Sequence, residues 1–424
     1  MMEGWKTDKF KNQIQYKSGY TWSKEQERKV QEPLSVRVLT VTNIQKELDL
    51  SEELYLQSVS DKDKKEKAVS KDWCIAVSSN GNRKRIGNAV FIKDDTDYLF
   101  ASFLTAFKPK ENSDILPNYF FRWLSSHDVQ ERITSVSEGT TGLGNLDIRF
   151  LRNMDILYPE KHEQSAIAAK LSKVDEAIAA VQGSIAAAER LKKSLMQNLL
   201  TGRMKPDGTL RNEDEFYVDE KFGKVPVGWV VKKLKNIADI QRGKFGHRPR
   251  NDERFYNGEY PFVQTNDVVE SVFYLKKASQ TLNELGISVS KCFPSGTIIM
   301  TIAANIGFVA ITNYKVYFPD SLIGINANEQ IILSTYMLLQ LMGYKNILDA
   351  QATESAQKNI NYSNLFPLLI PYPTDKQEQK QIVERIKKVF DTIENKQNKI
   401  AVLERLKKSL MQNLLTGKVR VNKE

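Results

Sequence analysis

The stretch ERLKKSLMQNLLTG occurs twice in this chain of 424 residues, at Glu189–Gly202 and again, 215 positions later, at Glu404–Gly417. Each copy closes a longer segment, roughly 161–201 and 375–416, in which apolar or small residues recur at alternating spacings of four and three. That spacing is a heptad repeat and places one narrow apolar stripe along a helix. The stripes consist of Ile167, Leu171, Val174, Ile178, Val181, Ile185, Ala188, Leu195 and Leu199 in the first segment, and of Ile382, Ile386, Val389, Ile393, Ile400, Leu403, Leu410 and Leu414 in the second.

A single helix cannot bury such a stripe alone, so the sequence predicts that the two helices pack against each other as a coiled coil. Forty residues at a rise of 1.5 Å make a rod about 60 Å long, which could fix the separation of whatever is attached to its ends. Lys192 and Lys407 interrupt the two stripes at the same step, and Gly202 and Gly417 follow the last apolar residues as helix stops.

The segments before each helix also repeat, but more weakly. Four short matches carry this repetition: Gly4-Trp5 with Gly228-Trp229, Gly19 with Gly243, Thr42-Asn43 with Thr265-Asn266, and Tyr158-Pro159 with Tyr372-Pro373. The predicted domains are therefore a first head at 1–158, a first helix at 159–203, a second head at 204–371, and a second helix with a tail at 372–424. Two heads of different sequence on nearly identical helices indicate that both halves dock on the same kind of partner and recognise different targets.

Each head has the pattern of a mixed α/β domain of about 150 residues. Strands are predicted at Val36–Thr42 and Trp73–Ser78 in the first head, and at Tyr260–Thr265 and Thr297–Ala303 in the second. Short helices are predicted at Leu116–Ser125 and Ser334–Met342. The polar, charged residues 204–225 are predicted to be a connector.

Composition indicates a soluble, cytoplasmic protein. No run approaches the roughly 20 apolar residues that a membrane helix needs, and the N-terminus has no apolar signal segment. The two cysteines, Cys74 and Cys292, lie in apparent strands, so a disulfide is not expected. The formal net charge is +10, and half of it lies on 374–418, where 11 basic residues exceed 6 acidic ones by 5. The heads are nearly neutral, so DNA binding would depend on local basic clusters.

No catalytic motif is recognisable. The three histidines, His127, His162 and His247, lack the spacing of metal ligands, and neither a phosphate-binding loop nor adjacent prolines of an amino-methyltransferase motif occur. The glycines Gly139, Gly142 and Gly144 are interpreted as a turn. We expect no metal and no cofactor in this chain.

Two basic loops have the composition of DNA-reading elements. SSNGNRKR at Ser78–Arg85 and IQRGKFGHRPRN at Ile240–Asn251 combine cations with amides and glycines. Arginine can bind guanine with two hydrogen bonds, asparagine or glutamine can do the same for adenine, and lysine supplies phosphate contacts. The candidate residues in these loops are Ser79, Asn80, Asn82, Arg83, Lys84 and Arg85 in the first head, and Arg242, Lys244, His247, Arg248 and Arg250 in the second.

Further candidates end predicted strands or follow them in turns: Thr42 and Asn43, Gln264, Thr265 and Asn266, and Asn305. For the loops, a solvated surface segment remains the alternative. For the strand ends, turn capping by asparagine is an equally good interpretation.

These features resemble the specificity subunit of Type I restriction–modification systems over essentially the whole chain. The resemblance rests on Pro226, Gly228 and Trp229, on Tyr-Pro followed by Glu-Gln at Glu163-Gln164 and Glu378-Gln379, and on the twin LKKSLMQNLLTG endings. The first half departs from the pattern because Gly4-Trp5 is not preceded by proline.

The resemblance implies two target-recognition domains and two helices packed antiparallel, with the halves related by a pseudo-twofold axis. It implies that each domain reads one half of a bipartite, asymmetric target in double-stranded DNA. It also implies two methyltransferase subunits docked on this chain, and restriction subunits that translocate DNA. S-adenosylmethionine, ATP and Mg²⁺ would belong to those partners, and this chain would be non-catalytic.

Two other classes of function remain open from the sequence. A fused enzyme with a hidden active site would need a methyltransferase motif, which is missing. A coiled-coil adaptor that binds only proteins would not need the two basic, asparagine-rich loops.

Overall fold

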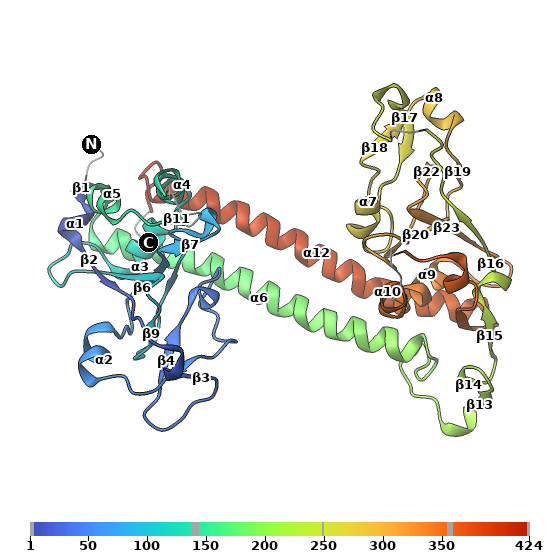
Figure 1. Cartoon of the computed structure of the whole chain (residues 1–424), viewed down its shortest axis with the longest axis horizontal. Helices are drawn as coiled ribbons and strands as arrows, with labels where there is room; N and C mark the ends of the chain where they lie inside the picture. The colour runs from blue at the N-terminus through green and yellow to red at the C-terminus, as the bar shows by residue number, and fades with distance from the viewer. Residues whose placement is uncertain (1–3, 138–143, 248–249, 354–358, 422–424) are drawn as a thin grey trace. The chain divides into compact units, whose positions relative to one another are not determined.

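The computed structural model describes residues 4–137, 144–247, 250–353 and 359–421. The chain forms two compact units, each built from one head and from parts of both long helices (Figure 1). Unit 1 comprises residues 1–181 and 399–424, and unit 2 comprises residues 182–398.

Unit 1 is built on an antiparallel sheet in the order β2-β10-β6-β8. Its strands are Ile14–Ser18, Leu104–Pro109, Cys74–Val77 and Ala89–Phe91. A smaller sheet, β3-β5-β4-β9, comprises Glu27–Arg28, Tyr55–Leu56, Val36–Leu39 and Leu99–Phe100. Two strand pairs complete the unit, β1 (Lys6–Lys9) with β12 (Asp155–Tyr158) and β7 (Ser79–Asn80) with β11 (Gly144–Asn145). Its short helices are α1 (Phe10–Gln13), α2 (Asp61–Lys67), α3 (Pro117–Leu124), α4 (His127–Val136) and α5 (Ile148–Asn153).

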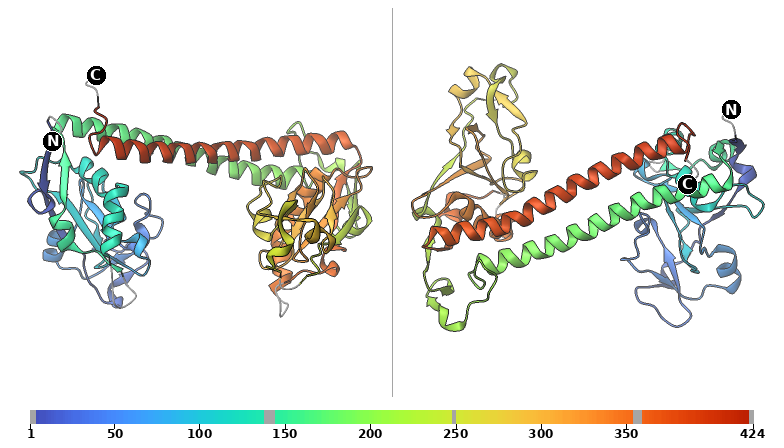
Figure 2. Two further views of the ribbon diagram at one scale, coloured as in Figure 1. Left: turned by 90° about the horizontal axis from the view of Figure 1, so that it is seen from above. Right: turned by 180° about the vertical axis from the view of Figure 1, so that it is seen from behind.

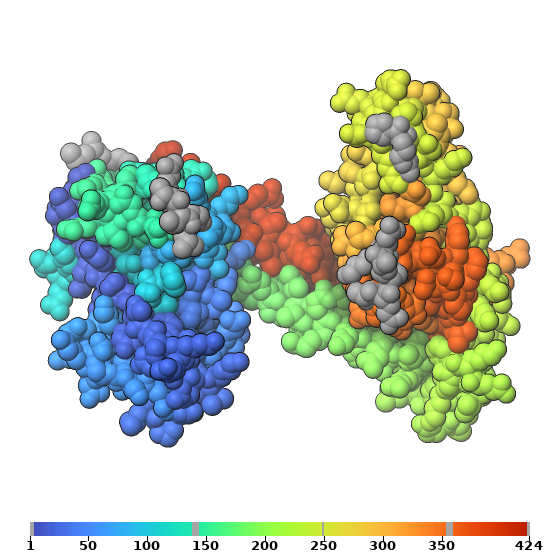
Figure 3. Space-filling model, viewed as in Figure 1, coloured from blue at the N-terminus to red at the C-terminus, as the bar shows by residue number. Residues whose placement is uncertain are grey.

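Unit 2 repeats this plan. Its main sheet has the order β16-β23-β20-β21, with strands Ala238–Arg242, Leu322–Ala327, Ile298–Thr301 and Val309–Ile311. A second sheet, β18-β17-β22-β19, comprises Gln280–Leu282, Tyr256–Phe262, Val316–Tyr317 and Cys292–Phe293. Together with α8 (Glu284–Ser288), this sheet forms a lobe that projects from the main sheet (Figures 1 and 3). The remaining elements are β13 (Phe216–Asp219), β14 (Gly223–Pro226), β15 (Trp229–Lys233), β24 (Leu369–Pro373), α7 (Thr265–Val269), α9 (Ser334–Gly343), α10 (Lys345–Thr353) and α11 (Tyr362–Leu365).

The predicted mixed α/β class of the heads is confirmed, and so is the repetition. In unit 1 the first strand, β1, pairs antiparallel with the last strand, β12, and in unit 2 the matching pair is β15, the strand that follows the hairpin β13–β14, with the last strand, β24. A buried tyrosine supports each closing strand, because the Tyr119 hydroxyl donates to the Leu157 carbonyl and the Tyr336 hydroxyl donates to that of Pro371. Burial raises the pKa of both phenols well above its ordinary value, so both remain protonated donors.

The glutamine of each Glu-Gln motif joins its long helix to the head. Gln164 and Gln379 are both fully buried. The Gln164 Oε1 atom accepts from the Leu116 N–H at 2.8 Å, and its Nε2 donates to the carbonyls of Asp114 and Pro159. Gln379 makes the matching three bonds, to the N–H of Leu333 and to the carbonyls of Ile331 and Pro373. One side chain therefore fixes the same junction in both units.

The long helices are α6, Lys161–Leu199, and α12, Lys376–Leu414, so both predicted helices exist. In unit 1, Ile167 and Leu171 near the start of α6 share an apolar core with Leu414 near the end of α12. In unit 2, Leu199 near the end of α6 shares a core with Ile382 near the start of α12. The two helices thus run antiparallel within each unit, side by side (Figure 2).

The heptad pattern predicted that each stripe is buried by the partner helix. In the structure, the heads also bury part of both stripes. Nine stripe residues, from the helix ends as far as Ile393 near the middle of α12, belong to the cores of the two units: Ile167, Leu171 and Leu414 in unit 1, and Leu195, Leu199, Ile382, Ile386, Val389 and Ile393 in unit 2. Leu410 and Ile185 pack against these cores from partly buried positions. Val174, Ile178 and Ile400 are half-buried, whereas Val181, near the middle of α6, is buried but belongs to neither of these cores.

The two lysines that interrupt the stripes have specific partners. Lys407 Nζ lies 2.6 Å from a carboxylate oxygen of Asp175, which also binds the buried guanidinium of Arg122. Lys192 lies over the ring of Phe390 at 5.1 Å and pairs with Glu189. Burial by itself raises the pKa of Asp175, but the hydrogen bond from Lys407 and the charge of Arg122 outweigh it, and that pKa lies below its ordinary value.

Several local predictions need correction. The predicted strand Val36–Thr42 ends at Leu39 and is followed by a 3₁₀ turn at Val41–Asn43, and the predicted strand Tyr260–Thr265 ends at Phe262. The predicted connector contains the hairpin β13–β14. Both cysteines do lie in strands as predicted, with Cys74 buried in β6 and Cys292 exposed in β19. Across the described residues, no helix is both long and apolar enough to cross a membrane.

Candidate nucleic-acid interface

The basic loop of unit 1 follows strand β6 and is shaped by its own asparagines. The side chain of Asn80 accepts from the Asn82 N–H at 2.8 Å, and that of Asn82 accepts from the Lys84 N–H at 3.1 Å, which caps a 3₁₀ turn at Arg83–Arg85. Ser79 and Asn80 also pair with β11. The side chains of Asn82, Arg83 and Lys84 are exposed, so they can meet a nucleic acid.

Arg85 does not point outward as the other cations of this loop do. One of its guanidinium nitrogens donates to the carbonyls of Val41 and Ile44, at 2.9 and 2.7 Å. The structure thereby brings two predicted segments together, the turn that contains Thr42 and the loop 79–85. Arg85 accordingly links the two segments, because one of its guanidinium nitrogens is bonded to the backbone of the turn.

Asn43 is also not available to read bases. It is 3 % exposed, its Oδ1 accepts from the Thr40 N–H at 2.8 Å, and its Nδ2 donates to the carbonyls of Asp49 and Glu52. Turn capping, the alternative interpretation of this asparagine, is what the structure shows. Thr42 next to it is exposed.

In unit 2 the same turn corresponds to Gln264–Asp267, with Gln264 in the place of Thr40. Asp267 Oδ2 accepts from the Gln264 N–H at 2.8 Å, as Asn43 does from Thr40. The structural counterpart of Asn43 is therefore Asp267, one residue beyond the Asn266 that the sequence match indicated. The sequence match aligned the two Thr-Asn pairs and therefore missed this shift of one residue. Thr40 and Gln264 occupy equivalent positions but are different residue types, so the sequence could not show that they correspond.

Two arginines of the basic loop of unit 2 bind the same residue, Asp320. Arg242 Nε donates to the Asp320 carbonyl at 2.6 Å, and the guanidinium of Arg250 binds the Asp320 carboxylate. Lys244 is exposed, while its backbone N–H and carbonyl are bonded to Phe318 and Ser290. Of these cations, Arg242 supports the fold through its Nε, and Lys244 and Arg250 present their side chains at the surface.

His247 is part of a small polar and aromatic group. Its Nε2 lies 3.0 Å from Asp252, and its ring stacks on Phe255 with a centroid distance of 4.2 Å. Hydrogen bonds from Arg254 hold the pKa of Asp252 well below its ordinary value, so the histidine faces a carboxylate. Arg248, the remaining candidate of this loop, lies outside the described residues.

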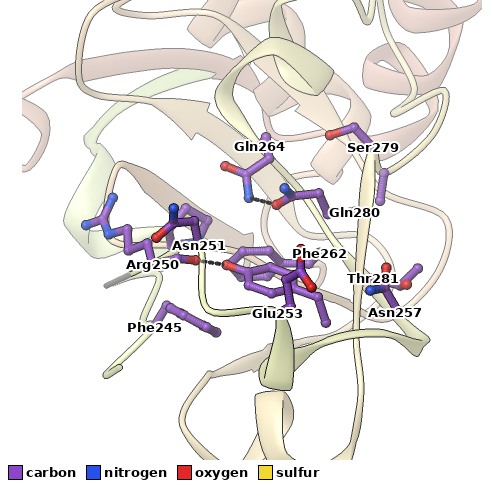
Figure 4. Close-up of a pocket in the computed structure, with 13 residues that line it drawn as sticks. Phe245, Arg250, Asn251, Glu253, Asn257, Phe262, Gln264, Ser279, Gln280 and Thr281 are labelled. Carbon is purple, nitrogen blue, oxygen red and sulfur yellow. Dashed lines mark hydrogen bonds between the residues drawn. The ribbon is translucent and has the colours of Figure 1, made fainter. Parts of the chain in front are cut away.

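A cavity of about 540 Å³ opens between this loop and the lobe of unit 2 (Figure 4). Two predicted residues, Arg250 and Gln264, line it. It also has polar lining residues that the sequence did not single out: Asn251, Asn257, Ser279, Gln280 and Thr281. Gln264 Nε2 donates to Gln280 Oε1 at 2.8 Å across the cavity mouth. This pair could not be inferred from the sequence, because its members lie sixteen positions apart on different elements.

The other predicted strand-end residues lie elsewhere. Thr265 and Asn266 are the first residues of α7, where Thr265 is half-buried and Asn266 is exposed. Asn305 is exposed in the turn after β20, and the same turn packs at Gly307 against Lys345 of α10. Neither Asn266 nor Asn305 lines the cavity. A search of the described residues for three or more His, Cys, Asp or Glu side chains placed to hold a metal ion finds none.

Comparison with known proteins supplies the family. Residues 2–190 and 226–405 each match the sequence model of the Type I restriction modification DNA specificity domain. Among curated proteins, the putative type I restriction enzyme MjaX specificity subunit of Methanocaldococcus jannaschii is 24 % identical, over 99 % of this chain and 94 % of its own length. The MjaVIII specificity subunit of the same organism is 28 % identical, over 66 % of each chain.

Two solved structures share the fold. The S subunit of a Type I restriction–modification system from M. genitalium superposes with a TM-score of 0.59 at 14 % identity, covering 99 % of this chain and 97 % of its own. A chain from a study of complex assembly and conformational transition of the type I R-M system gives 0.56 at 16 % identity, covering 97 % and 98 %. The architecture of two heads and two long helices is therefore that of known specificity subunits.

Proposed function

The chain belongs to the Type I restriction modification DNA specificity domain family, and on that premise we propose that each head reads one half of a bipartite, asymmetric DNA site. Unit 1 would contact one half-site through the exposed residues around Thr42 and Asn82–Lys84. Unit 2 would contact the other through Lys244, Arg250 and the polar mouth of its cavity. The long helices would set the number of unread base pairs between the half-sites.

The observation that carries this proposal is a constant framework with different surfaces. Gln164 and Gln379 make the same three bonds, and Tyr119 and Tyr336 support the same closing strands. By contrast, the basic loops at residues 79–85 and 240–251 differ in sequence and in the contacts of their side chains. Two copies of one framework fit two copies of one docking partner, while different surface loops fit two different base sequences.

The partners belong to the same proposal. Two methyltransferase subunits would dock on this chain and supply S-adenosylmethionine and adenine methylation, and restriction subunits would supply ATP- and Mg²⁺-dependent cleavage. The chain itself would contribute recognition of DNA and no catalytic group. Purified without partners, it is expected to transfer no methyl groups, and methyl transfer by the isolated chain would contradict this assignment.

A head exchange tests the proposal directly. Residues 1–158 are replaced by the corresponding head of another member of the family, and the chain is produced with its partner subunits in a host that lacks other methyltransferases. Sequencing of methylated adenines is expected to show one half-site changed and the other retained. The reciprocal exchange of residues 204–371 is the matched control and should change only the other half-site.

Changes in both half-sites after either exchange would contradict the assignment of one head to one half-site. Affinity for random DNA measured over a range of salt concentrations adds a second test, since phosphate contacts make binding weaken as salt rises. If the affinity of the assembled complex for random DNA did not change with salt, this chain would make no phosphate contacts, which would favour a protein that contacts only other proteins.

A further inference from the structure

The cavity in the lobe of unit 2 has a hydrogen-bonded pair of amides at its mouth (Figure 4). Gln264 precedes α7 and is half-buried, whereas Gln280 begins β18 and is exposed. Gln264 Nε2 lies 2.8 Å from Gln280 Oε1. Buried Asp267 fixes both ends of this pair, because its Oδ2 accepts from the N–H of Gln264 and from the N–H and hydroxyl of Ser279.

The pair leaves one acceptor and one donor outside its own hydrogen bond, at the two ends of the pair (Figure 4). One amide bond uses the Nε2 of Gln264 and the Oε1 of Gln280, so Gln264 Oε1 and Gln280 Nε2 remain for a ligand. Gln280 Nε2 has no hydrogen bond within the described part of the chain, and Gln264 Oε1, which faces the N–H of Asp267 in the capping box of α7, keeps its second lone pair for a ligand. Turning both amides over exchanges the roles of the residues, yet the pair still presents one carbonyl oxygen and one NH₂ group.

That combination matches the major-groove edge of adenine, which offers an N6 donor and an N7 acceptor. Building on the DNA-reading role proposed above, we propose that Gln264 and Gln280 together read one adenine in the half-site contacted by unit 2. Glutamine Oε1 would accept from the adenine N6–H, and the neighbouring Nε2 would donate to N7. One base would thus be recognised by two residues from different elements, one directly before α7 and one in β18.

The charges around the pair fit a base better than a phosphate. The polar lining is dominated by amides and hydroxyls, with one cation, Arg250, and one carboxylate, Glu253. The guanidinium of Arg250 is already paired with Asp320. A phosphate site would need unneutralised positive charge, whereas a base edge needs neutral donors and acceptors at fixed positions.

The pair is a property of unit 2 and not of the shared framework. In unit 1 the position of Gln264 is occupied by Thr40, whose hydroxyl lies 2.8 Å from that of Thr42 and 3.2 Å from Asn43 Oδ1. A change in the amide pair should therefore alter one base position of one half-site.

The test uses the full chain assembled with its methyltransferase subunits. Gln264→Ala, Gln280→Ala and Gln280→Glu are compared with Gln330→Ala, a matched control at an exposed glutamine of the same unit outside the cavity. Gln280→Glu keeps an acceptor for Gln264 Nε2 but removes the donor for N7. The methylated motif is read by sequencing, and affinities are measured on duplexes with the motif intact or with single base pairs replaced.

Both alanine variants are expected to make one A·T position degenerate in the half-site that follows unit 2 in the head exchange. Affinity for the intact motif should fall roughly 5- to 150-fold, and replacing that A·T pair should weaken the variants no further. Gln280→Glu should shift the preference at that position toward cytosine, whose N4 group is a donor. Gln330→Ala should leave the motif unchanged.

The proposal is overturned if the wild-type motif is defined and divides between the heads, yet all three variants keep it unchanged. It is also overturned if the position that becomes degenerate is a G·C pair or lies in the other half-site. A wild-type complex with no defined motif would instead reject the DNA-reading role itself, so the two failures are distinguishable. Melting temperatures of the variant complexes check that folding is retained, and Gln280→Glu decides if an alanine variant fails to fold.

Discussion

Replacing Gln379 by alanine removes the side chain that joins α12 to the head of unit 2. Three hydrogen bonds are lost, at 2.8 Å to the Leu333 N–H, 3.2 Å to the Ile331 carbonyl and 2.9 Å to the Pro373 carbonyl. At about 0.5–1.5 kcal/mol each, these three bonds contribute about 1.5–4.5 kcal/mol. The glutamine is fully buried, so its backbone partners lose their bonds in a place with little access to water. The loss in the free energy of unfolding should therefore lie toward the upper end of that range.

Urea denaturation followed by tryptophan fluorescence provides the assay. Trp229 is the tryptophan of residues 182–398 and is buried, and its Nε1 donates to Glu378 beside Gln379, so in a chain whose other four tryptophans are replaced by phenylalanine its emission reports on this junction. Gln377→Ala is the matched control, because Gln377 is exposed on the same helix turn, and it should change stability by less than about 0.5 kcal/mol. A loss below about 1 kcal/mol for Gln379→Ala would refute the reasoning that this residue fixes the junction.

Two further changes test other contacts. Asp175→Asn should reduce the difference in the free energy of unfolding between neutral and acidic pH. The pKa of Asp175 is depressed in the folded chain, so its ion pair with Lys407 stabilises the fold above about pH 4. This stabilisation is lost as the pH falls below that value. Urea midpoints at pH 6 and pH 3 check this, with Asp391→Asn on an exposed pair as control, and an equal pH response of both variants and the wild type would contradict it. Gly243→Ala should lower the free energy of unfolding by about 1–3 kcal/mol, because a Cβ there would lie 2.3 Å from the Pro319 carbonyl oxygen. Gly246→Ala is the control, because the nearest atom to an added Cβ there is 3.5 Å away. If thermal unfolding showed a similar loss of stability for both variants, close packing around Gly243 would not be the cause.

The sequence by itself predicted the two long helices, to within about two residues at each end, and the division of the chain into two repeated halves. Helix and repeat signals are local or periodic, so they can be read along the chain without knowledge of distant contacts. The heptad stripe did not show that the ends of the helices complete the cores of the heads. That depends on which residues of the head lie beside them, such as Tyr372 and Leu365 in unit 2.

The tertiary structure decided which polar residues remain available for a ligand. Asn43 and Arg85 have the chemistry of DNA-reading residues in the sequence, yet both direct their side chains to backbone atoms of the turn at residues 40–52. Gln280 was not among the predicted DNA-binding residues, yet it faces Gln264 in the fold. A hydrogen bond needs two groups within about 3 Å, and the chain brings such groups together from positions far apart in sequence. Composition can therefore indicate a recognition loop, but only the folded arrangement determines which of its donors and acceptors are left for DNA.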